Sequence, residues 1–209
     1  MINLSPKTIP SIFATVVLVM ISLGGCHDGV SESTKNEALW TPTPVAILDL
    51  DGQEIQVPKK SDDVAQVFIF SRIDCPISNR YAAEVNRIYD EFSGRGIQFS
   101  LVFVDPEETP EVIRHHLIEF SYKIPTFRDP ERRLVKLSGA TVTPEAVIFS
   151  CSTGMVYRGR IDDMFVDFGK QRNEPNNRDV RQILTDLIDR KTLAFRETKA
   201  IGCYIEELK

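Results

Sequence analysis

The sequence contains few cysteines, few histidines and no cluster of basic residues. Its 25 Lys and Arg side chains are scattered among 30 Asp and Glu side chains, which gives a formal net charge of −5. Proteins that bind nucleic acid neutralise phosphates with clustered basic side chains, so this pattern excludes nucleic acid as a partner. No internal repeat is visible, and 209 residues can bury one good core but hardly two. We therefore expect one folded domain.

The sequence also lacks an apolar run that would span a bilayer comfortably. The run IFATVVLVMISL lies within residues 1–25, and its last leucine begins the sequence LGGC, which places Cys26 directly behind two glycines. This ending resembles a bacterial lipoprotein signal, in which residues 1–25 are removed and Cys26 is lipidated. The alternative is an ordinary secretory signal or a membrane anchor with an incidental cysteine. The resemblance implies an extracytoplasmic protein of the bacterial cell envelope, held at the membrane by its N-terminal lipid.

Three further segments follow the signal. Residues 26–43 are polar and interrupted by prolines, so they cannot bury enough apolar surface to fold and form a flexible tether. Residues 44–190 alternate between strand and helix patterns and form the domain. Residues 191–209 form a C-terminal tail that carries Cys203.

The first half of the domain predicts a strand, a helix and a second strand. A hairpin comes first, because residues 45–57 alternate on both sides of LDGQ. The strand VAQVFIF is almost continuously apolar, as expected of a strand covered on both faces. Apolar side chains then recur every three or four residues, at Ile77, Tyr81, Val85, Ile88 and Phe92, which predicts a helix. The strand IQFSLVFV completes a right-handed parallel crossover.

The second half repeats this alternation with variation. Thr109 caps a helix that begins at Pro110 and buries Val112, Ile113, Leu117 and Phe120. The remaining elements are a short strand or extended turn at 123–129, a short helix at 131–139, a hairpin turning near Ser152 to Gly154, a loop at 166–179 and a last helix at 178–191. The fold class is α/β, with a central mixed β-sheet flanked by helices on both faces.

Cys75 lies where the first buried strand ends and the helix begins. A thiol at a helix N-terminus is close to unpaired backbone N–H groups and to the positive end of the helix dipole, both of which favour the thiolate. Pro76 fits the first helical position, where its missing N–H costs nothing. The carboxylate of Asp74 would raise the pKa of the thiol, and Arg72 and Arg80 would offset it. The alternative is that Cys75 is only a small buried apolar residue.

These residues resemble the thioredoxin-like redoxins, which include peroxiredoxins, thioredoxins and Sco-type copper chaperones. The resemblance rests on a buried strand, a polar turn, Cys75-Pro76 opening a helix and, about seventy residues later, TVTPEAVIF leading into a strand. It covers residues 44–190 and implies a thioredoxin-like fold in which Cys75 is catalytic. It also implies that the Thr143-Pro144 bond is cis and close to Cys75, with the backbone of Thr143 binding the extended chain of a partner.

Three departures from these relatives limit the mechanism. Thioredoxins have a second cysteine three residues after the first, where this chain has Ser78, and Sco-type proteins have it four residues on, at Asn79. The first change removes the local disulfide, and the second removes a soft copper ligand. Peroxiredoxins have a threonine three residues before the reactive cysteine, where this chain has Arg72. None of the three mechanisms therefore transfers intact.

The other cysteines leave the source of a second thiol open. Without Cys26, the chain has Cys75, Cys151 and Cys203, which allow one disulfide and one free thiol. Cys151 follows a strand near a hairpin turn and is expected to be structural. Cys203 lies on a tail that we expect to be mobile, where it either resolves oxidised Cys75 or is an exposed bystander.

Other polar residues predict structural roles. His115 and His116 are adjacent on a helix, about 100° apart, so they cannot both face one metal ion and are expected at the surface. Asp162 and Asp163 are expected at the polar end of a hairpin. We expect no metal and no cofactor.

These observations predict a membrane-tethered thiol–disulfide oxidoreductase or a peroxiredoxin-like antioxidant. In either case Cys75 is the nucleophile, Cys203 the candidate second catalytic thiol, and the partner a protein thiol or disulfide, or a peroxide. The alternative is a Sco-like metallochaperone or a redox-inactive binding protein with a thioredoxin-like fold.

Overall fold

The computed structural model describes residues 42–208. The predicted signal, the lipidation site Cys26 and nearly all of the predicted tether lie outside these residues. The elements, in chain order, are β1 (Val45–Asp49), β2 (Glu54–Val57), β3 (Ala65–Ser71), α1 (Pro76–Phe92), the 3-10 helix η1 (Ser93–Arg95), β4 (Ile97–Phe103), α2 (Pro110–Glu119), β5 (Thr126–Arg128), α3 (Arg133–Ser138), β6 (Val142–Thr143), β7 (Glu145–Ser150), β8 (Gly154–Gly159), β9 (Phe165–Asp167), β10 (Lys170–Gln171), α4 (Asp179–Ile188), β11 (Arg196–Glu197) and β12 (Cys203–Tyr204).

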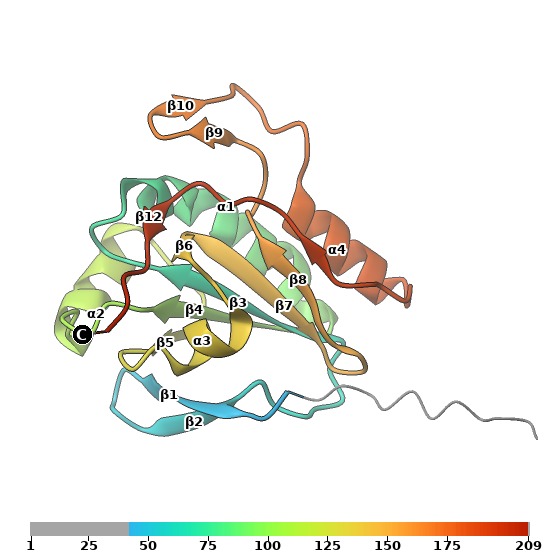
Figure 1. Cartoon of the computed structure of the whole chain (residues 1–209), viewed down its shortest axis with the longest axis horizontal. Coiled ribbons are helices and arrows are strands. Elements are labelled where there is room, and N and C mark those ends of the chain that lie inside the picture. Colours follow the sequence, from blue (N-terminus) through green and yellow to red (C-terminus); the bar gives the residue numbers. More distant parts are fainter. Residues whose placement is uncertain (1–41, 209) are drawn as a thin grey trace, which may run out of the picture. The chain divides into compact units, whose positions relative to one another are not determined.

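Eight strands form one mixed sheet in the order β11-β8-β7-β3-β4-β5-β1-β2 (Figure 1). The central strand β3 is parallel to β4 and antiparallel to β7. The strand β3, the helix α1 and the strand β4 make the predicted parallel crossover, and β1 and β2 make the predicted hairpin. This confirms the predicted α/β class with a central mixed sheet.

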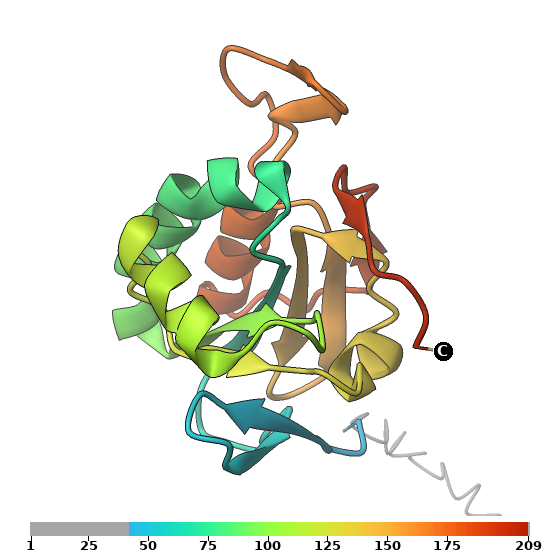
Figure 2. The ribbon, with the colours of Figure 1, turned by 90° about the vertical axis from the view of Figure 1, so that its left-hand side faces the viewer.

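Helices cover both faces of the sheet, as the sequence predicts. Figure 2 shows α1, α2 and α4 on one side and α3 on the other. On the first side, side chains of α1 and α4 pack with alternate side chains of β3 and β4 into a core that contains Cys75. On the second side, α3 and the β1–β2 hairpin pack against the remaining side chains of β3, β4 and β7. Burial on both faces explains the nearly continuous apolar sequence of β3.

The predicted apolar stripe of α1 is confirmed, but that of α2 is only partly correct. Thr109 caps α2, since its hydroxyl accepts a hydrogen bond from the N–H of Val112 at 3.4 Å. Ile113 is buried, whereas the side chain of Val112 is about half exposed. His116 takes the buried position instead and packs against Phe103. The expectation that both histidines lie at the surface is therefore wrong for His116, because an imidazole can fill an apolar site edge-on to an aromatic ring.

The stretch 166–179 is not wholly a loop. Residues 165–171 form the short hairpin β9–β10, which extends away from the main sheet in Figures 1 and 2. Asp162 and Asp163, expected at a polar hairpin end, are both buried. Asp162 accepts a hydrogen bond from the hydroxyl of Tyr81 at 2.6 Å, and Asp163 accepts one from the N–H of Asn177 at 2.9 Å. These bonds connect the hairpin to α1 and to the start of α4.

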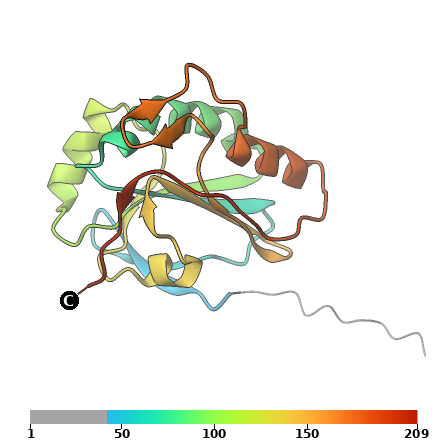
Figure 3. The ribbon, with the colours of Figure 1, turned by 45° about the horizontal axis from the view of Figure 1, so that its top comes forward.

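The C-terminal tail is docked, so the expectation that Cys203 lies on a mobile segment is wrong. After α4 the chain returns along the sheet and adds β11 to β8, in parallel. It then adds β12 to β6, in antiparallel, as Figure 3 shows from above. Within residues 42–208, no helix is long and apolar enough to cross a membrane.

Candidate active site around Cys75

Cys75 is the N-cap residue of α1, and Pro76 is the first helical residue. The backbone of Cys75 is extended, with φ −84° and ψ 107°, so its side chain turns back over the first turn of the helix. There the sulfur accepts a hydrogen bond from the N–H of Ser78 at 3.4 Å. A cysteine therefore replaces the serine or aspartate that commonly caps a helix, and the helix dipole acts on its sulfur.

Thr143 lies next to Cys75, at the end of β6 and directly before the proline that precedes β7. The thiol of Cys75 donates a hydrogen bond to the carbonyl oxygen of Thr143, with 2.9 Å between sulfur and oxygen. The Thr143-Pro144 peptide bond is cis, as the sequence predicts. The structure therefore brings Thr143, Pro144 and Cys75 together, although they are almost seventy residues apart in the chain.

Cys203 completes this group. It is the pairing partner of Thr143 in the β12–β6 ladder, and its side chain packs against the core that contains Cys75. The described cysteines form no disulfide. Cys75 itself is completely buried, with 0% of its surface exposed, while Cys203 is partly exposed. Both thiols therefore lie where β12 pairs with β6, and both contact Thr143: Cys75 through its hydrogen bond and Cys203 through its strand pairing.

The two thiols have opposite pKa shifts. Burial alone would raise the pKa of Cys75, but the nearby polar side chains of Cys203, Ser78 and Thr143 and the N–H of Ser78 outweigh it, and the net pKa lies below the ordinary value of 9.0. Burial, followed by the hydrogen bond to Cys75 and the charge of its thiolate, raises the pKa of Cys203 to about 12. Cys203 therefore holds its proton more tightly than Cys75 does.

The turn before Cys75 is held by charged groups. Arg72 forms ion pairs with Asp74 and with Asp105, both at 3.0 Å. It therefore offsets Asp74, as the sequence suggests, and it fills the position at which peroxiredoxins have a threonine. Arg80 does not take part, because its guanidinium donates to Gln171 at 3.1 Å. The side chain of Asp74 is 69% exposed, which weakens its effect on the sulfur.

Sequence reasoning missed Glu108, which also holds this turn. Its carboxylate accepts a hydrogen bond from the N–H of Ile73 at 2.6 Å. Burial, and to a lesser degree the nearby carboxylates of Asp105 and Asp74, raise the pKa of Glu108 to about 7. Nothing in the spacing of Glu108 in the sequence indicates this contact, because the loop after β4 comes back to the turn only in the folded chain.

The two residues that replace a second cysteine have structural roles at the site. Ser78 is buried. Its N–H donates a hydrogen bond to the sulfur of Cys75, and its side chain helps to lower the pKa of Cys75. The amide of Asn79 donates to the carbonyl oxygen of Ile73 at 3.0 Å and so closes the turn. Both residues stabilise the position or the charge of Cys75 and supply no thiol.

Cys151 is remote from this group. It follows β7 at the end where Ser150 pairs with Ala65, whereas Cys75 follows the opposite end of β3. Its sulfur is 3.6 Å from the hydroxyl of Ser61 and 3.7 Å from the amide nitrogen of Gln66. This position agrees with the structural role expected for Cys151.

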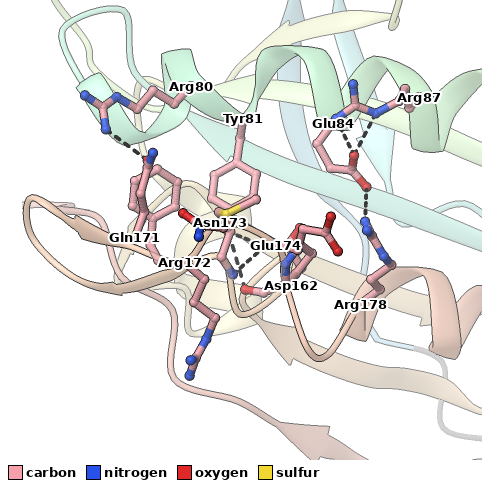
Figure 4. Close-up of a pocket in the computed structure, with 13 residues that line it drawn as sticks. Arg80, Tyr81, Glu84, Arg87, Asp162, Gln171, Arg172, Asn173, Glu174 and Arg178 are labelled. Carbon is pink, nitrogen blue, oxygen red and sulfur yellow. Dashed lines mark hydrogen bonds and ion pairs between the residues drawn. The ribbon is translucent and has the colours of Figure 1, made fainter.

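A separate pocket of about 680 Å³ lies between α1 and the β9–β10 hairpin (Figure 4). Its charged groups bind one another. Glu84 is in ion pairs with Arg87 at 2.7 Å and Arg178 at 3.6 Å, and Tyr81 donates to Asp162. Arg80 of α1 donates to Gln171 of β10, and this bond connects the hairpin to α1. Among residues 42–208, no three His, Cys, Asp or Glu side chains are grouped so as to hold a metal ion.

Comparison with known proteins identifies the fold. No family model and no curated protein matches the sequence. An uncharacterised conserved protein from Geobacillus kaustophilus is similar in structure, with a TM-score of 0.67 and 24% identity over 80% of this chain and 90% of its own. A hypothetical protein from Sinorhizobium meliloti also has a TM-score of 0.67, with 21% identity over 78% and 91%. A putative thiol:disulfide interchange protein DsbE from Chlorobium tepidum has a TM-score of 0.53, with 15% identity over 70% and 94%.

At these identities the similarity is one of fold. A putative thioredoxin from Neisseria meningitidis has a TM-score of 0.53 and 14% identity over 69% of this chain and 87% of its own. The sheet order and the position of Cys75 at the start of α1, beside the cis Thr143-Pro144 bond, agree with this fold. The chain has a thioredoxin-like fold.

Proposed function

We propose that the chain is a thiol–disulfide oxidoreductase with Cys75 as nucleophile and Cys203 as resolving thiol. The observation that carries this proposal is the position of Cys203: it pairs with Thr143, whose carbonyl oxygen accepts the hydrogen bond of the Cys75 thiol. A second thiol at this place supplies what the replacement of the local cysteine by Ser78 removes. The names of two neighbours, a putative DsbE and a putative thioredoxin, support the same class of reaction.

The reaction proceeds by two thiol–disulfide exchanges. The thiolate of Cys75 attacks one sulfur of a partner's disulfide, forms a mixed disulfide and expels the partner's other sulfur as a thiolate. The thiolate of Cys203 then attacks the sulfur of Cys75, forms the Cys75–Cys203 disulfide and expels the partner's first sulfur. The partner gains two electrons and the chain loses two, so an external dithiol must reduce the chain again.

The opposite pKa shifts of the two thiols fit this order. Cys203 loses its proton less readily than Cys75, because burial and the hydrogen bond and charge of Cys75 raise the pKa of Cys203 to about 12. When Cys75 enters a mixed disulfide, its charge and its hydrogen-bond acceptance are lost. The pKa of Cys203 then falls, and the second nucleophile is released only after the first step has taken place.

A disulfide fits the site better than a peroxide. Thr143 and Pro144 bind the partner's extended chain, as a sheet edge binds a strand. The peroxide-binding threonine of peroxiredoxins is replaced by Arg72, which is held in ion pairs with Asp74 and Asp105. We further propose that the chain works outside the cytoplasm, anchored through a lipid on Cys26.

The reduced full chain tests this function when it is treated with an oxidised model protein or with hydrogen peroxide and mapped by mass spectrometry. The model disulfide is expected to be reduced and to leave a Cys75–Cys203 cross-link. Cys203→Ser is expected to accumulate the mixed disulfide on Cys75, and the matched variant Cys151→Ser is expected to behave like the unchanged chain. A disulfide that forms on Cys75 but resolves equally fast in Cys203→Ser would remove Cys203 from the mechanism.

A further inference from the structure

The edge of β6 is occupied by the chain's own C-terminal strand. Cys203 and Tyr204 pair in antiparallel with Thr143 and Val142, and the N–H of Ile205 donates to the carbonyl oxygen of Thr141 at 2.9 Å. These are the backbone groups that the proposed function assigns to the extended chain of a partner. Figures 1 and 2 show β12 alongside β6. A partner and the tail therefore compete for the same edge.

The tail meets this edge with a regular pattern of side chains. Ile201 and Cys203 pack against the core that contains Cys75, Ile205 packs against the core on the other side, and Tyr204 is 77% exposed. Gly202 lies directly on Thr143, because a Cβ at this position would be 2.1 Å from the carbonyl oxygen of Thr143. Only glycine allows the two backbones to approach so closely.

The docked tail closes the site. Cys75 has 0% of its surface exposed while β12 is in place, so no disulfide can reach its sulfur in this state. The tail is weakly attached at this edge, since β12 and β6 are each two residues long. Strands this short open at a low free energy compared with the central strands of a sheet.

We propose that β12 is an internal stand-in for the partner, which binds by displacing it, and that the tail returns to Cys75 to resolve the mixed disulfide. The partner is a protein whose cystine lies in an extended, accessible segment, with an apolar residue two positions before the reacting cysteine and glycine directly before it. This sequence pattern copies Ile201, Gly202 and Cys203. The redox part of this inference rests on the proposed function, but the docking of such a segment on β6 does not.

Access to Cys75 tests the displacement. We compare the full chain with Gly202→Ala, which forces the tail off Thr143, and with Ile205→Pro, which removes the N–H donor to Thr141. The matched control is Gly94→Ala, because a Cβ at Gly94 meets nothing within 4 Å. Alkylation of Cys75 by iodoacetamide, measured on its peptide, is expected to be at least tenfold faster in the first two variants and unchanged in the control. Equal rates in all four chains would overturn the inference.

A peptide tests the proposed sequence pattern of the partner, copied from Ile201, Gly202 and Cys203, without any redox step. The peptide copies residues 198–208 with Cys203→Ser, and its binding to the full-length Gly202→Ala chain is measured by fluorescence anisotropy. We expect saturable binding to this variant and at least tenfold weaker binding to the unchanged chain, whose tail occupies β6. The same peptide with Gly202→Val is expected to lose binding.

The alkylation rate of Cys75 and the binding of the peptide separate this inference from the proposed function. Equal binding of the glycine and valine peptides would overturn the pattern, and binding to the unchanged chain at full strength would overturn displacement. If the chain reduces no disulfide but both readouts agree with expectation, the docking surface stands and the oxidoreductase assignment fails.

Discussion

Cys75 combines a lowered thiol pKa with complete burial, and its neighbours explain both. The sulfur accepts a hydrogen bond from the N–H of Ser78, and the nearby polar side chains of Cys203, Ser78 and Thr143 also lower its pKa, while burial shields it from solvent. Buried thiols ordinarily have raised pKa values. At this site the hydrogen bonds outweigh the cost of burial, so reactivity depends on individual donors that can be removed one at a time.

Cys203 is the donor whose removal is most informative. Cys203→Ala deletes the hydrogen bond to Cys75, so the pKa of Cys75 is expected to rise, whereas Cys203→Ser keeps a donor and is expected to leave the pKa nearly unchanged. Ultraviolet absorbance of the thiolate, followed against pH, measures this pKa, with the same titration of Cys75→Ser subtracted as background. A lower midpoint in Cys203→Ala than in the unchanged chain would contradict the assignment of Cys203 as donor.

Glu108 predicts a pH dependence of stability. Its pKa is raised from 4.5 to about 7 in the folded chain, so the protonated form is favoured by folding. Its contribution to stability is fully present below pH 4.5 and is lost as pH rises through about 7. We expect the unchanged chain to lose about 2 kcal/mol relative to Glu108→Gln over this range, after allowing for solvent screening of a partly exposed group.

Urea unfolding between pH 4 and pH 8 checks this prediction. Glu107→Gln makes the same chemical change at an exposed neighbour and serves as the matched control. A stability difference between the unchanged chain and Glu108→Gln that does not vary with pH would show that Glu108 titrates no differently when the chain unfolds.

At the scale of elements, the start of α3 shows how a short helix is stabilised when the side chain of its N-cap residue makes no capping hydrogen bond. The N-cap residue Arg132 is in the left-handed conformation, and the buried carboxylate of Asp129 accepts from the N–H groups of Arg133 at 2.8 Å and of Leu134 and Val135 at 2.9 Å. One side chain therefore satisfies three backbone donors that the helix itself leaves unpaired.

Asp129→Ala is expected to lower the free energy of unfolding by about 3 kcal/mol, because three backbone donors lose their partner inside the molecule. Asp129→Asn keeps one acceptor oxygen and is expected to lose less. Urea unfolding at one fixed pH measures both variants. If the two variants unfolded at the same urea concentration as the unchanged chain, the carboxylate would have no capping role.

The sequence predicts elements that carry their own periodicity and misses those that depend on distant partners. The stripe of α1, the hairpin β1–β2 and the cap Thr109 are local signals, and the structure confirms them. The strands β11 and β12 have two residues each and pair with strands far earlier in the chain. No pattern of so few residues predicts a strand.

The same limit applies to the candidate site. Cys75 and the Thr143-Pro144 bond were predictable, because a helix N-terminus and a resemblance to redoxins single them out. The contacts of Cys203 with Cys75 and of Glu108 with Ile73 were not, since each depends on how a loop or tail returns to the turn. His116 was assigned to the wrong environment, because adjacent histidines on a helix do not indicate which one faces the core.

At the scale of the whole molecule, the domain and its membrane anchor are separate predictions. We expect the mature protein to partition into detergent with an acylated Cys26, because LGGC ends the apolar run of the signal. Cys26→Ala is expected to abolish incorporation of labelled fatty acid and to leave disulfide exchange by the domain unchanged. An intact N-terminal peptide that contains an unmodified Cys26 would contradict the lipid anchor.

The position of β12 in the chain has a consequence for biosynthesis. Thr143 and its partner Cys203 are about sixty residues apart, so a growing polypeptide contains α1 and the β6 edge well before the strand that covers them. At a synthesis rate of roughly 5–20 residues per second, Cys75 stays uncovered for about 3–12 s. During this interval the nascent thiol is open to oxidants and to foldases, and it becomes protected only when the tail docks.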